Sequence, residues 1–425
     1  MGNTPISERY KWVILAILTT VYVFNFIDRQ VLVILQEPIR VELGLSDTQL
    51  GLLTGLTFAA LYVILGIPIA RLADKGNRKN IIVASLATWS LMTVLSGLSK
   101  NFVHLFLARM GVGVGEAGGS PPAHSIISDY FPSKQRATAL SIYSTGIYIG
   151  ILIGFVTGGV LAKNYGWRVT FYLLGIPGLL FAIMLYFVVK EPIKGRLDST
   201  DLGDGNPILK EVLSSLLKKK TFVYVALASG FHTFGLFGFS NFSASFLSRV
   251  HQVDVATAGV VLGLAMGIGG GTGTFLGGYL SDKLSHRDMR WYIWVPMIAG
   301  ASALFFNYLL FFSETVSVVY FAILMVSFLT AFYLGPTIAI THSLVNAKMR
   351  AFASAILFFV LNLIGLGGGP LVIGMLSDYL QPSFGDLSLR WAFCATFISA
   401  IIALGFQYLA SKNYLNDLET SKLSE

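Results

Sequence analysis

The 425-residue chain is strongly apolar: 54% of its residues are hydrophobic, 12% are charged, and the mean hydropathy is +0.70. This composition excludes an ordinary soluble protein and predicts an integral membrane protein without a separate soluble domain. The single cysteine, Cys394, lies in an apolar segment, so a disulfide framework is excluded.

Twelve apolar segments predict an all-α membrane protein with 12 transmembrane helices, because about 20 apolar residues are needed to cross a bilayer. The first apolar segment follows a short polar N-terminus, is long, carries Asp28 and Arg29 and lacks a small-residue cleavage site, so we interpret it as a span and not as a signal peptide. The expected helices occupy residues 12–35, 48–70, 80–98, 102–126, 137–162, 168–190, 221–248, 256–280, 291–312, 316–343, 351–376 and 391–411.

A polar stretch divides these spans into two groups of six. It contains the sequence DSTDLGDGNP and ends in three consecutive lysines. We therefore predict an N-terminal six-helix bundle at residues 1–190, a cytoplasmic linker at 191–220 and a C-terminal six-helix bundle at 221–425.

The distribution of Lys and Arg predicts the orientation of the spans. Most of the 30 Lys and Arg residues lie in the N-terminal segment, the even-to-odd loops, the linker and the C-terminal tail. This bias places both termini and the linker in the cytoplasm, and we expect the bacterial inner membrane. The basic residues are dispersed over short loops without interleaved aromatic residues, which argues against nucleic acid as a partner.

Four ionisable residues lie inside hydrophobic spans of the first half: Asp28 and Arg29 in span one, Arg109 and Glu116 in span four. Each charge near a helix centre costs about 2.5–3.5 kcal/mol, so such residues usually face an interior cavity and mark a substrate or proton pathway. At about 1.5 Å per residue, Asp28 and Arg109 fall at a similar depth and can pair, whereas Glu116 lies about 10 Å deeper.

These residue types suggest a division of roles. We expect Asp28 and Glu116 to carry coupling protons, because a carboxyl group can gain or lose a proton as its charged partners come and go. Arg29 and Arg109 stay charged and can bind a phosphate or carboxylate headgroup. The alternative is a fixed ion-pair network that only assembles the first six helices.

The predicted spans of the second half have no Lys, Arg, Asp or Glu in their interiors but are rich in aromatic residues. A cavity with one charged wall and one apolar wall would suit an amphiphile. Many of these rings are expected to face lipid or the core instead. The candidate substrate contacts in this half are Phe231, His232, Asn241, Ser243 and Asn362.

Glycine patterns predict close helix packing in two spans. In span four, glycines surround Glu116, and Pro121 and Pro122 are expected to loosen the helix just beyond it. In span five, glycines recur at helical spacing. These are Gly146, Gly150, Gly154, Gly158 and Gly159.

A local pattern occurs twice, at the ends of the second and eighth predicted spans. ARLADKGNRK, starting at residue 70, aligns with GYLSDKLSHR, starting at residue 278, an offset of 208 residues. The chain thereby resembles the major facilitator superfamily, although Ala70 and Asn77 stand where that family usually has Gly. The leucine, glycine and arginine pattern of span four supports the same resemblance.

The superfamily resemblance implies two six-helix bundles related by a pseudo-two-fold axis, with alternating access by rocking of the halves. It also implies a cytoplasmic gate in which Asp74 lies against the N-terminus of the eleventh helix, near Arg350. The gating residues that it implies are Asp74, Arg78, Arg136 and Asp282.

The first half shows a more specific resemblance. NFIDRQ in span one, GEAGGSPP in span four, DYFPSKQRA after it and GWR at the start of span six closely resemble the Spinster family. That family transports lysolipids and sphingosine-1-phosphate-type lipids. Sugar-acid and organic-anion carriers share parts of the GEAG and GWR patterns.

We therefore expect a secondary active, proton-coupled transporter of an amphipathic anionic lipid. The alternatives are a proton-coupled carrier of small organic anions such as sugar acids, and a lipid sensor that does not transport. The sequence has no phosphate-binding GxxxxGK[ST] loop and no metal-ligand spacing, so we expect no ATP-driven pump, no enzyme and no cofactor besides the coupling proton. A monomer embedded in the membrane is the superfamily expectation.

Overall fold

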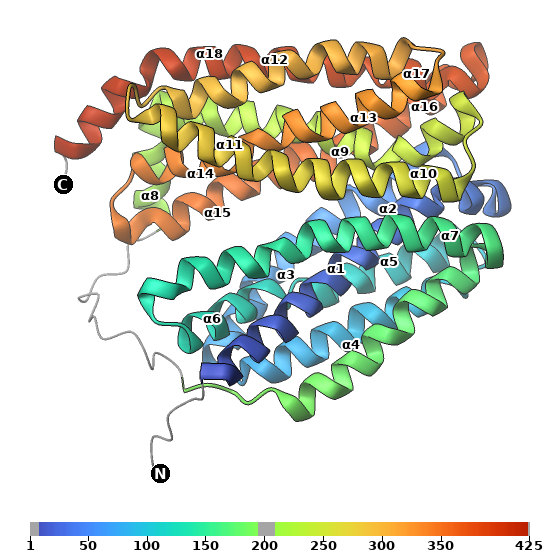
Figure 1. The fold of residues 1–425 in the computed structure, drawn as a ribbon, viewed down its shortest axis with the longest axis horizontal. Helices are drawn as coiled ribbons and strands as arrows, with labels where there is room; N and C mark the ends of the chain where they lie inside the picture. The colour runs from blue at the N-terminus through green and yellow to red at the C-terminus, as the bar shows by residue number, and fades with distance from the viewer. Residues whose placement is uncertain (1–7, 194–208, 424–425) are drawn as a thin grey trace. The chain divides into compact units, whose positions relative to one another are not determined.

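The computed structural model describes residues 8–193 and 209–423, and all regular secondary structure in these ranges is helical (Figure 1). The all-α fold class is thereby confirmed for the described part of the chain. The predicted linker falls partly outside it, because residues 194–208 are not described.

The helices up to residue 193 follow the predicted spans. The longest, α7, combines predicted spans five and six, and Gly166 interrupts it with non-helical angles of φ 78° and ψ 166° that suit glycine. The helices are α1 (Glu8–Leu43), α2 (Asp47–Thr54), α3 (Leu56–Lys75), α4 (Arg78–Ser96), α5 (Phe102–Glu116), α6 (Ser120–Tyr130) and α7 (Ser133–Val188).

The second half begins with a short helix in the predicted linker and continues with long apolar helices. The α-helices are α8 (Leu209–Lys218), α9 (Lys220–His251), α10 (Val255–Leu262), α11 (Gly270–Ser285), α12 (Trp291–Phe312), α13 (Val316–Thr330), α14 (Leu334–Ser343), α15 (Arg350–Leu361), α16 (Gly369–Phe384), α17 (Ser388–Ala392) and α18 (Cys394–Leu423). Short 3₁₀ or π segments connect several of them.

Nine helical segments of the described ranges are long and apolar enough to cross a membrane. Two of these, residues 133–188 and 350–421, are each long enough for two crossings at about 20 residues per span. Predicted span four is divided into α5 and α6, and neither part reaches span length. The number of twelve spans therefore stays a prediction.

Several predicted spans are broken near their middle. Span two is divided at Gly55, which has φ −106° and ψ −96°, and span four ends α5 just before Pro121 and Pro122 open α6. Glycine-rich π-helices interrupt the eighth and eleventh spans at Gly263–Gly269 and Asn362–Gly368. Glycine weakens a helix, and π-helical turns often mark functional positions. The expected loosening beyond Glu116 is confirmed.

The chain forms two compact units. Unit 1 contains residues 1–45, 57–203 and 254–263, and unit 2 contains residues 46–56, 204–253 and 264–425. Each unit therefore includes one short helix from the other half of the sequence: α2 belongs to unit 2, and α10 belongs to unit 1. The division of the chain into bundles at the 191–220 linker stays a prediction.

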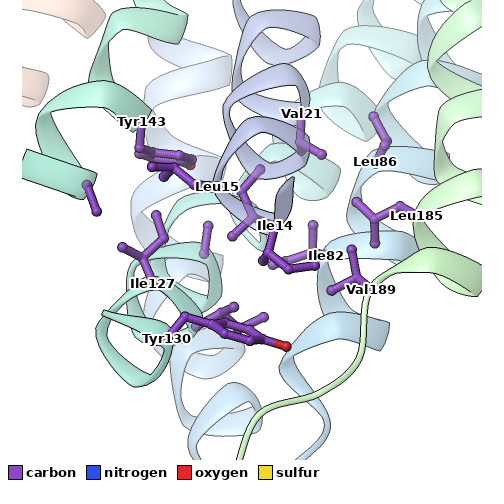
Figure 2. Packing of buried hydrophobic residues seen from close by; sticks show 14 of the residues in the cluster. Ile14, Leu15, Val21, Ile82, Leu86, Ile127, Tyr130, Tyr143, Leu185 and Val189 are labelled. Carbon is purple, nitrogen blue, oxygen red and sulfur yellow. The ribbon is translucent and has the colours of Figure 1, made fainter. Parts of the chain in front are cut away.

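The buried hydrophobic cluster of unit 1 lies near the N-terminal end of α1. Ile14 and Leu15 of α1 are buried there against Ile82 of α4, and Tyr143 and Leu185 of α7 complete the same cluster (Figure 2). Burial of an Ile or Leu side chain contributes about 1.5–3 kcal/mol where its surface would otherwise contact water. This cluster joins α1 to the two helices that flank it.

The glycine stripe of span five permits close packing of α7 on α1, as the spacing predicts. A Cβ added at Gly150 would lie 2.6 Å from the Cβ of Phe26 and 2.7 Å from the carbonyl oxygen of Val23. At Gly154 the same atom would lie 3.0 Å from the Cβ of Gln30. The two helices therefore approach closely because these positions lack side chains.

We expect Gly150→Ala to destabilise the protein by about 1–3 kcal/mol, since the added methyl group must displace the α1 backbone. The matched control is Gly405→Ala on α18, where nothing lies within 4 Å of an added Cβ. There the same change should be neutral or stabilising by up to about 1 kcal/mol. Thermal unfolding of the purified variants in detergent measures both, and equal melting temperatures would contradict the packing argument.

Candidate functional site

The four charged residues predicted from the sequence lie on α1 and α5 of unit 1, and three of them are shielded from solvent. Asp28 and Glu116 are 1% exposed, and Arg109 is 3% exposed. The side chain of Arg29 is 25% exposed, so it is the member of the cluster that solvent can reach. Adjacent helical positions diverge by about 100°, which explains why Asp28 is buried while Arg29 is accessible.

Arg29 and Glu116 form an ion pair across α1 and α5. Both Nε and Nη2 of Arg29 lie 2.6 Å from Oε2 of Glu116, and the guanidinium also lies 5.0 Å from the centre of the Phe26 ring. The other oxygen, Oε1 of Glu116, has no hydrogen-bond partner among the described residues. The pair therefore leaves one acceptor of the carboxylate unused.

Arg109 reaches the main chain of Asp28 and not its carboxylate. Nη1 of Arg109 donates to the carbonyl oxygen of Asp28 at 3.3 Å, a long hydrogen bond. Both carboxylate oxygens of Asp28 and the Nε atom of Arg109 lack a hydrogen-bond partner within the described ranges. The side-chain pairing that we expected for these two residues is therefore absent from this arrangement, although their charges still interact electrostatically.

Two neutral residues that the sequence analysis did not single out belong to the same cluster. Asn25 on α1 is 4% exposed and lies beside Glu116, and Thr93 on α4 is fully buried and lies beside Asp28. Asn25 precedes Asp28 by three positions, so helical spacing from the charged residues is a signal that could have identified it. Thr93 gives no such signal, because only the packing of α4 brings it to this position.

This arrangement is suited to binding an anion and exchanging protons. A buried polar group without a partner costs free energy, so the unpartnered atoms of Asp28, Arg109 and Glu116 favour any ligand or proton that satisfies them. A guanidinium binds carboxylate or phosphate with two parallel hydrogen bonds. No group of three or more His, Cys, Asp or Glu residues in the described ranges could hold a metal ion.

The candidate contacts of the second half have mostly local partners in unit 2. His232 bonds through Nε2 to the carbonyl oxygen of Thr330 at 2.8 Å, where α13 ends. Asn241 and Ser243 donate to carbonyl oxygens of the preceding turn of α9, at 2.8 and 2.9 Å. Each of these three side chains thus has a hydrogen bond within unit 2.

The remaining two candidates of unit 2 differ from these three. Phe231 stacks on Phe406 of α18, with ring centres 6.1 Å apart. Asn362 is half-buried at the first position of a π-helix. Their contact with a substrate stays a prediction, as it does for the other candidates of this half.

The predicted gating residues have well-defined surroundings, except for Asp74, whose side chain lies outside the described part of the structure. Arg78 is 2% exposed and binds Asp129 and Glu191, whereas Arg136 donates to the carbonyl oxygen of Ser128 at 2.9 Å. In unit 2, Asp282 accepts a hydrogen bond from Tyr292 at 2.8 Å. Arg78 thus ties the start of α4 to the segment that follows α7.

The GWR sequence forms a clamp at the opposite end of unit 1. After the turn at Gly166, Trp167 Nε1 donates to Oε2 of Glu42 at the end of α1 and Arg168 Nη2 donates to Oε1 at 2.7 Å. Arg168 also donates to the carbonyl oxygen of Ser99. The motif therefore joins the kink of α7 to the C-terminal ends of α1 and α4, a structural role that its sequence did not reveal.

Comparisons with known proteins agree with this fold. Residues 18–368 match the family described as the Major Facilitator Superfamily. An MFS-type efflux pump of Mycolicibacterium smegmatis is 31% identical over 97% of this chain and 95% of its own. Protein spinster homolog 1 of Xenopus tropicalis is 28% identical over 97% of this chain and 82% of its own. A hexuronate transporter of Bacillus subtilis is 27% identical over 63% of this chain and 64% of its own.

Solved structures give the same relationship. A bacterial homologue of the human lysosomal transporter Spinster, crystallised in an inward-facing and occupied conformation, is 33% identical over 97% of this chain and 99% of that chain, with a TM-score of 0.86. An inward-facing and unoccupied structure of such a homologue is 32% identical with a TM-score of 0.88 over the same shares. The Spinster resemblance of the sequence motifs is therefore confirmed.

We expect the buried pair of Arg29 and Glu116 to be coupled by about 1–3 kcal/mol in a double-mutant cycle with Arg29→Gln and Glu116→Gln. The comparison pair is Lys163 and Asp254, also in unit 1, whose side chains are 57% and 45% exposed. Exposed pairs are worth about 0–1 kcal/mol. Unfolding free energies of the single and double variants measure both couplings, and a weaker coupling for the buried pair would contradict the assigned geometry.

Proposed function

Because the chain belongs to the major facilitator superfamily as a Spinster-like member, it is a membrane transporter, and we propose that it carries an amphipathic anionic lipid by proton-coupled alternating access. A lysolipid or a sphingosine-1-phosphate-like lipid has the required chemistry. The observation that carries the proposal is the buried cluster of α1 and α5, in which both carboxylate oxygens of Asp28, Nε of Arg109 and Oε1 of Glu116 have no hydrogen-bond partner among the described residues.

In the proposed mechanism, Asp28 and Glu116 hold the coupling protons. Glu116 has an arginine partner through one oxygen, whereas the Asp28 carboxyl group has no hydrogen-bond partner among the described residues. A carboxyl group that loses its partner is more costly to keep charged, so exchange of arginine contacts can be linked to proton uptake and release.

The headgroup is proposed to bind the two arginines. Arg29 is the accessible member of the cluster and Arg109 is the buried member with an unpartnered Nε atom, so an entering anion would meet Arg29 first. A phosphate or carboxylate that bound Arg29 would compete directly with Glu116 for the same nitrogens. Substrate binding would thereby release Glu116 to accept a proton.

The apolar part of the substrate is assigned to the aromatic spans of the second half, where Phe231 and the polar residues Asn241, Ser243, Asn362 and His232 are candidates. The relation to Spinster homologues supports a lipid. A small organic anion is the second candidate, because a hexuronate transporter is among the relatives and the arginine chemistry serves either ligand. A monomer with cytoplasmic termini, gated near Arg78, Arg136 and Asp282, completes the proposal.

We expect Glu116→Gln and Asp28→Asn to abolish the acceleration of transport by an imposed pH gradient, because neither amide can carry a proton. The substitutions remove only the ability to carry a proton, so transport driven by substrate exchange at constant pH should persist. Proteoliposome uptake with and without the gradient measures this.

The matched control for that experiment is Glu37→Gln, an acid on α1 that pairs with Arg40 of the same helix outside the cluster. It should keep the response to the gradient. Full gradient-driven uptake by Glu116→Gln and Asp28→Asn together would show that these residues do not couple protons.

We expect labelled lysolipid or sphingosine-1-phosphate to be transported by these proteoliposomes, and labelled glucuronate not to be. Arg109→Lys should lower lipid uptake by about tenfold or more, since an ammonium cannot reproduce the two parallel bonds of a guanidinium. Uptake of glucuronate alone would favour the organic-anion function. Saturable lipid binding without any flux would favour a sensor.

A further inference from the structure

A set of four buried residues along α1 and α4 of unit 1 has polar atoms without a hydrogen-bond partner among the described residues. On α1 these atoms are both carboxylate oxygens of Asp28 and both amide atoms of Gln36. Along α4 they are the hydroxyl oxygens of Thr93 and Ser99. None of the four residues is more than 1% exposed. Buried polar groups are normally hydrogen-bonded to protein or to ordered water, so this set points to a ligand that satisfies it.

Asp28 and Gln36 lie on the same buried side of α1. They are eight positions apart, which corresponds to about 12 Å along the helix axis and about 80° around it. Helical side chains lean towards the N-terminus of their helix, so the long Gln36 side chain extends back towards Asp28, whose shorter side chain leans the same way. The gap that remains is about 8 Å, which two water molecules bridge with three hydrogen bonds of about 2.8 Å each.

The apolar Leu32 lies between these two residues on α1, so the polar groups beside it have to come from α4, which contacts α1. Thr93 lies beside Asp28. Thr93, Ser96 and Ser99 follow one another at intervals of three residues, and none is more than 1% exposed. Ser96 donates to the carbonyl oxygen four positions before it at 2.9 Å, but its oxygen can still accept a hydrogen bond. This part of α4 therefore offers a hydroxyl group at nearly every turn.

This row of hydroxyl groups ends at the clamp that the GWR sequence forms. Arg168 donates both to the carbonyl oxygen of Ser99 and to the carboxylate of Glu42. The side chains of Arg168 and Glu42 are 34% and 51% exposed, so the clamp is accessible from outside unit 1. Gln36 lies six positions before Glu42, about 9 Å deeper along α1. The polar positions therefore extend from the accessible clamp to the buried Asp28.

We propose that α1 and α4 enclose a file of water molecules between the Glu42 clamp and Asp28, and that protons reach Asp28 along this file. The second part rests on the proposed function, in which Asp28 carries a coupling proton. A buried water needs two to four polar partners, and the α1 and α4 side chains supply them. A chain of hydrogen-bonded water molecules can pass a proton from one member to the next.

The file gives the proton a route that differs from the route of the substrate. The charged groups that act on Asp28 are Arg109 and Glu116 of α5, and α4 adds only the neutral Thr93. A substrate anion would enter this cluster at Arg29, its accessible member. The water file instead leads from Asp28 to the Glu42 clamp, so a proton can arrive while the anion occupies the arginines.

The first test detects the water itself and needs no transported substrate. X-ray pulses convert water into hydroxyl radicals that modify the nearest side chain, and mass spectrometry locates the modified residue. Leu32 and Leu86 are both fully buried, but only Leu32 lies beside the proposed file. Leu32 should therefore be modified at least about fivefold faster than Leu86 in the purified protein. Combining Gln36→Leu with Thr93→Val should lower the rate at Leu32 to that of Leu86.

The second test measures the proton route in proteoliposomes. Gln36→Leu and Thr93→Val each replace an unpartnered polar group by an apolar one of similar size, so neither should lower the melting temperature. Each should slow uptake driven by a pH gradient by about fivefold or more and leave substrate exchange at constant pH within about twofold. The matched control is Ser90→Ala on α4, which also removes a buried hydroxyl without a partner in the described ranges. Ser90 packs against Gly178 of α7, so this change should leave both rates within about twofold.

Each outcome decides one part of the proposal. Equal modification of Leu32 and Leu86 in the unsubstituted protein would overturn the water file. Modification of Leu32 with unchanged gradient-driven uptake in both Gln36→Leu and Thr93→Val would overturn the proton route, as would an equal loss in Ser90→Ala. Absence of gradient-driven uptake by the unsubstituted protein would count against the proposed function and overturn the proton route with it, whereas the modification of Leu32 alone decides the water file.

Discussion

Charge burial in an apolar environment is the constraint on which this structure depends. The first and fourth spans hold four ionisable side chains, three of which are shielded from solvent, and such groups must find partners inside the protein. The structure satisfies them unevenly: Arg29 and Glu116 pair, whereas the Asp28 carboxyl group and Nε of Arg109 have no hydrogen-bond partner in the described ranges. A network that served only assembly would be expected to satisfy its buried members. The uneven satisfaction is therefore the observation that favours the proposed role of this cluster in transport over a role in assembly alone.

The location of this cluster could be predicted from the sequence, but its hydrogen bonds and ion pairs could not. Hydropathy and a rise of about 1.5 Å per residue are enough to place Asp28 and Arg109 at similar depth. Which guanidinium meets which carboxylate depends on the rotation of each helix and on side-chain rotamers, and these follow from packing such as that of Gly150 on α1. The expected partner of Asp28 was therefore wrong in atomic detail, and Thr93, which α4 contributes, could not be found at all.

The sequence also predicted continuous spans at positions where the helices of the structure are interrupted. Hydrophobicity stays high through Gly55 and through the glycines of Gly263–Gly269, so a hydropathy pattern gives no sign of a change in helix geometry. The breaks matter because the boundaries between the two compact units fall at Leu56 and Gly263, beside them. A glycine break lets the first part of a span pack with one set of helices while the rest continues with another. The basic loop repeat was visible in the sequence, but its extension to α2 and α10 required their packing.

The offset of 208 residues that relates the two basic loops also relates α2 to α10, and the two helices share close backbone packing but differ in their charged contacts. Close contact between backbones depends on glycine at Gly51 and Gly259, and both copies keep it. The charged contacts of the two helices differ: the Asp378 carboxylate accepts hydrogen bonds from the backbone of α2, whereas Lys163 pairs with Asp254, which caps α10.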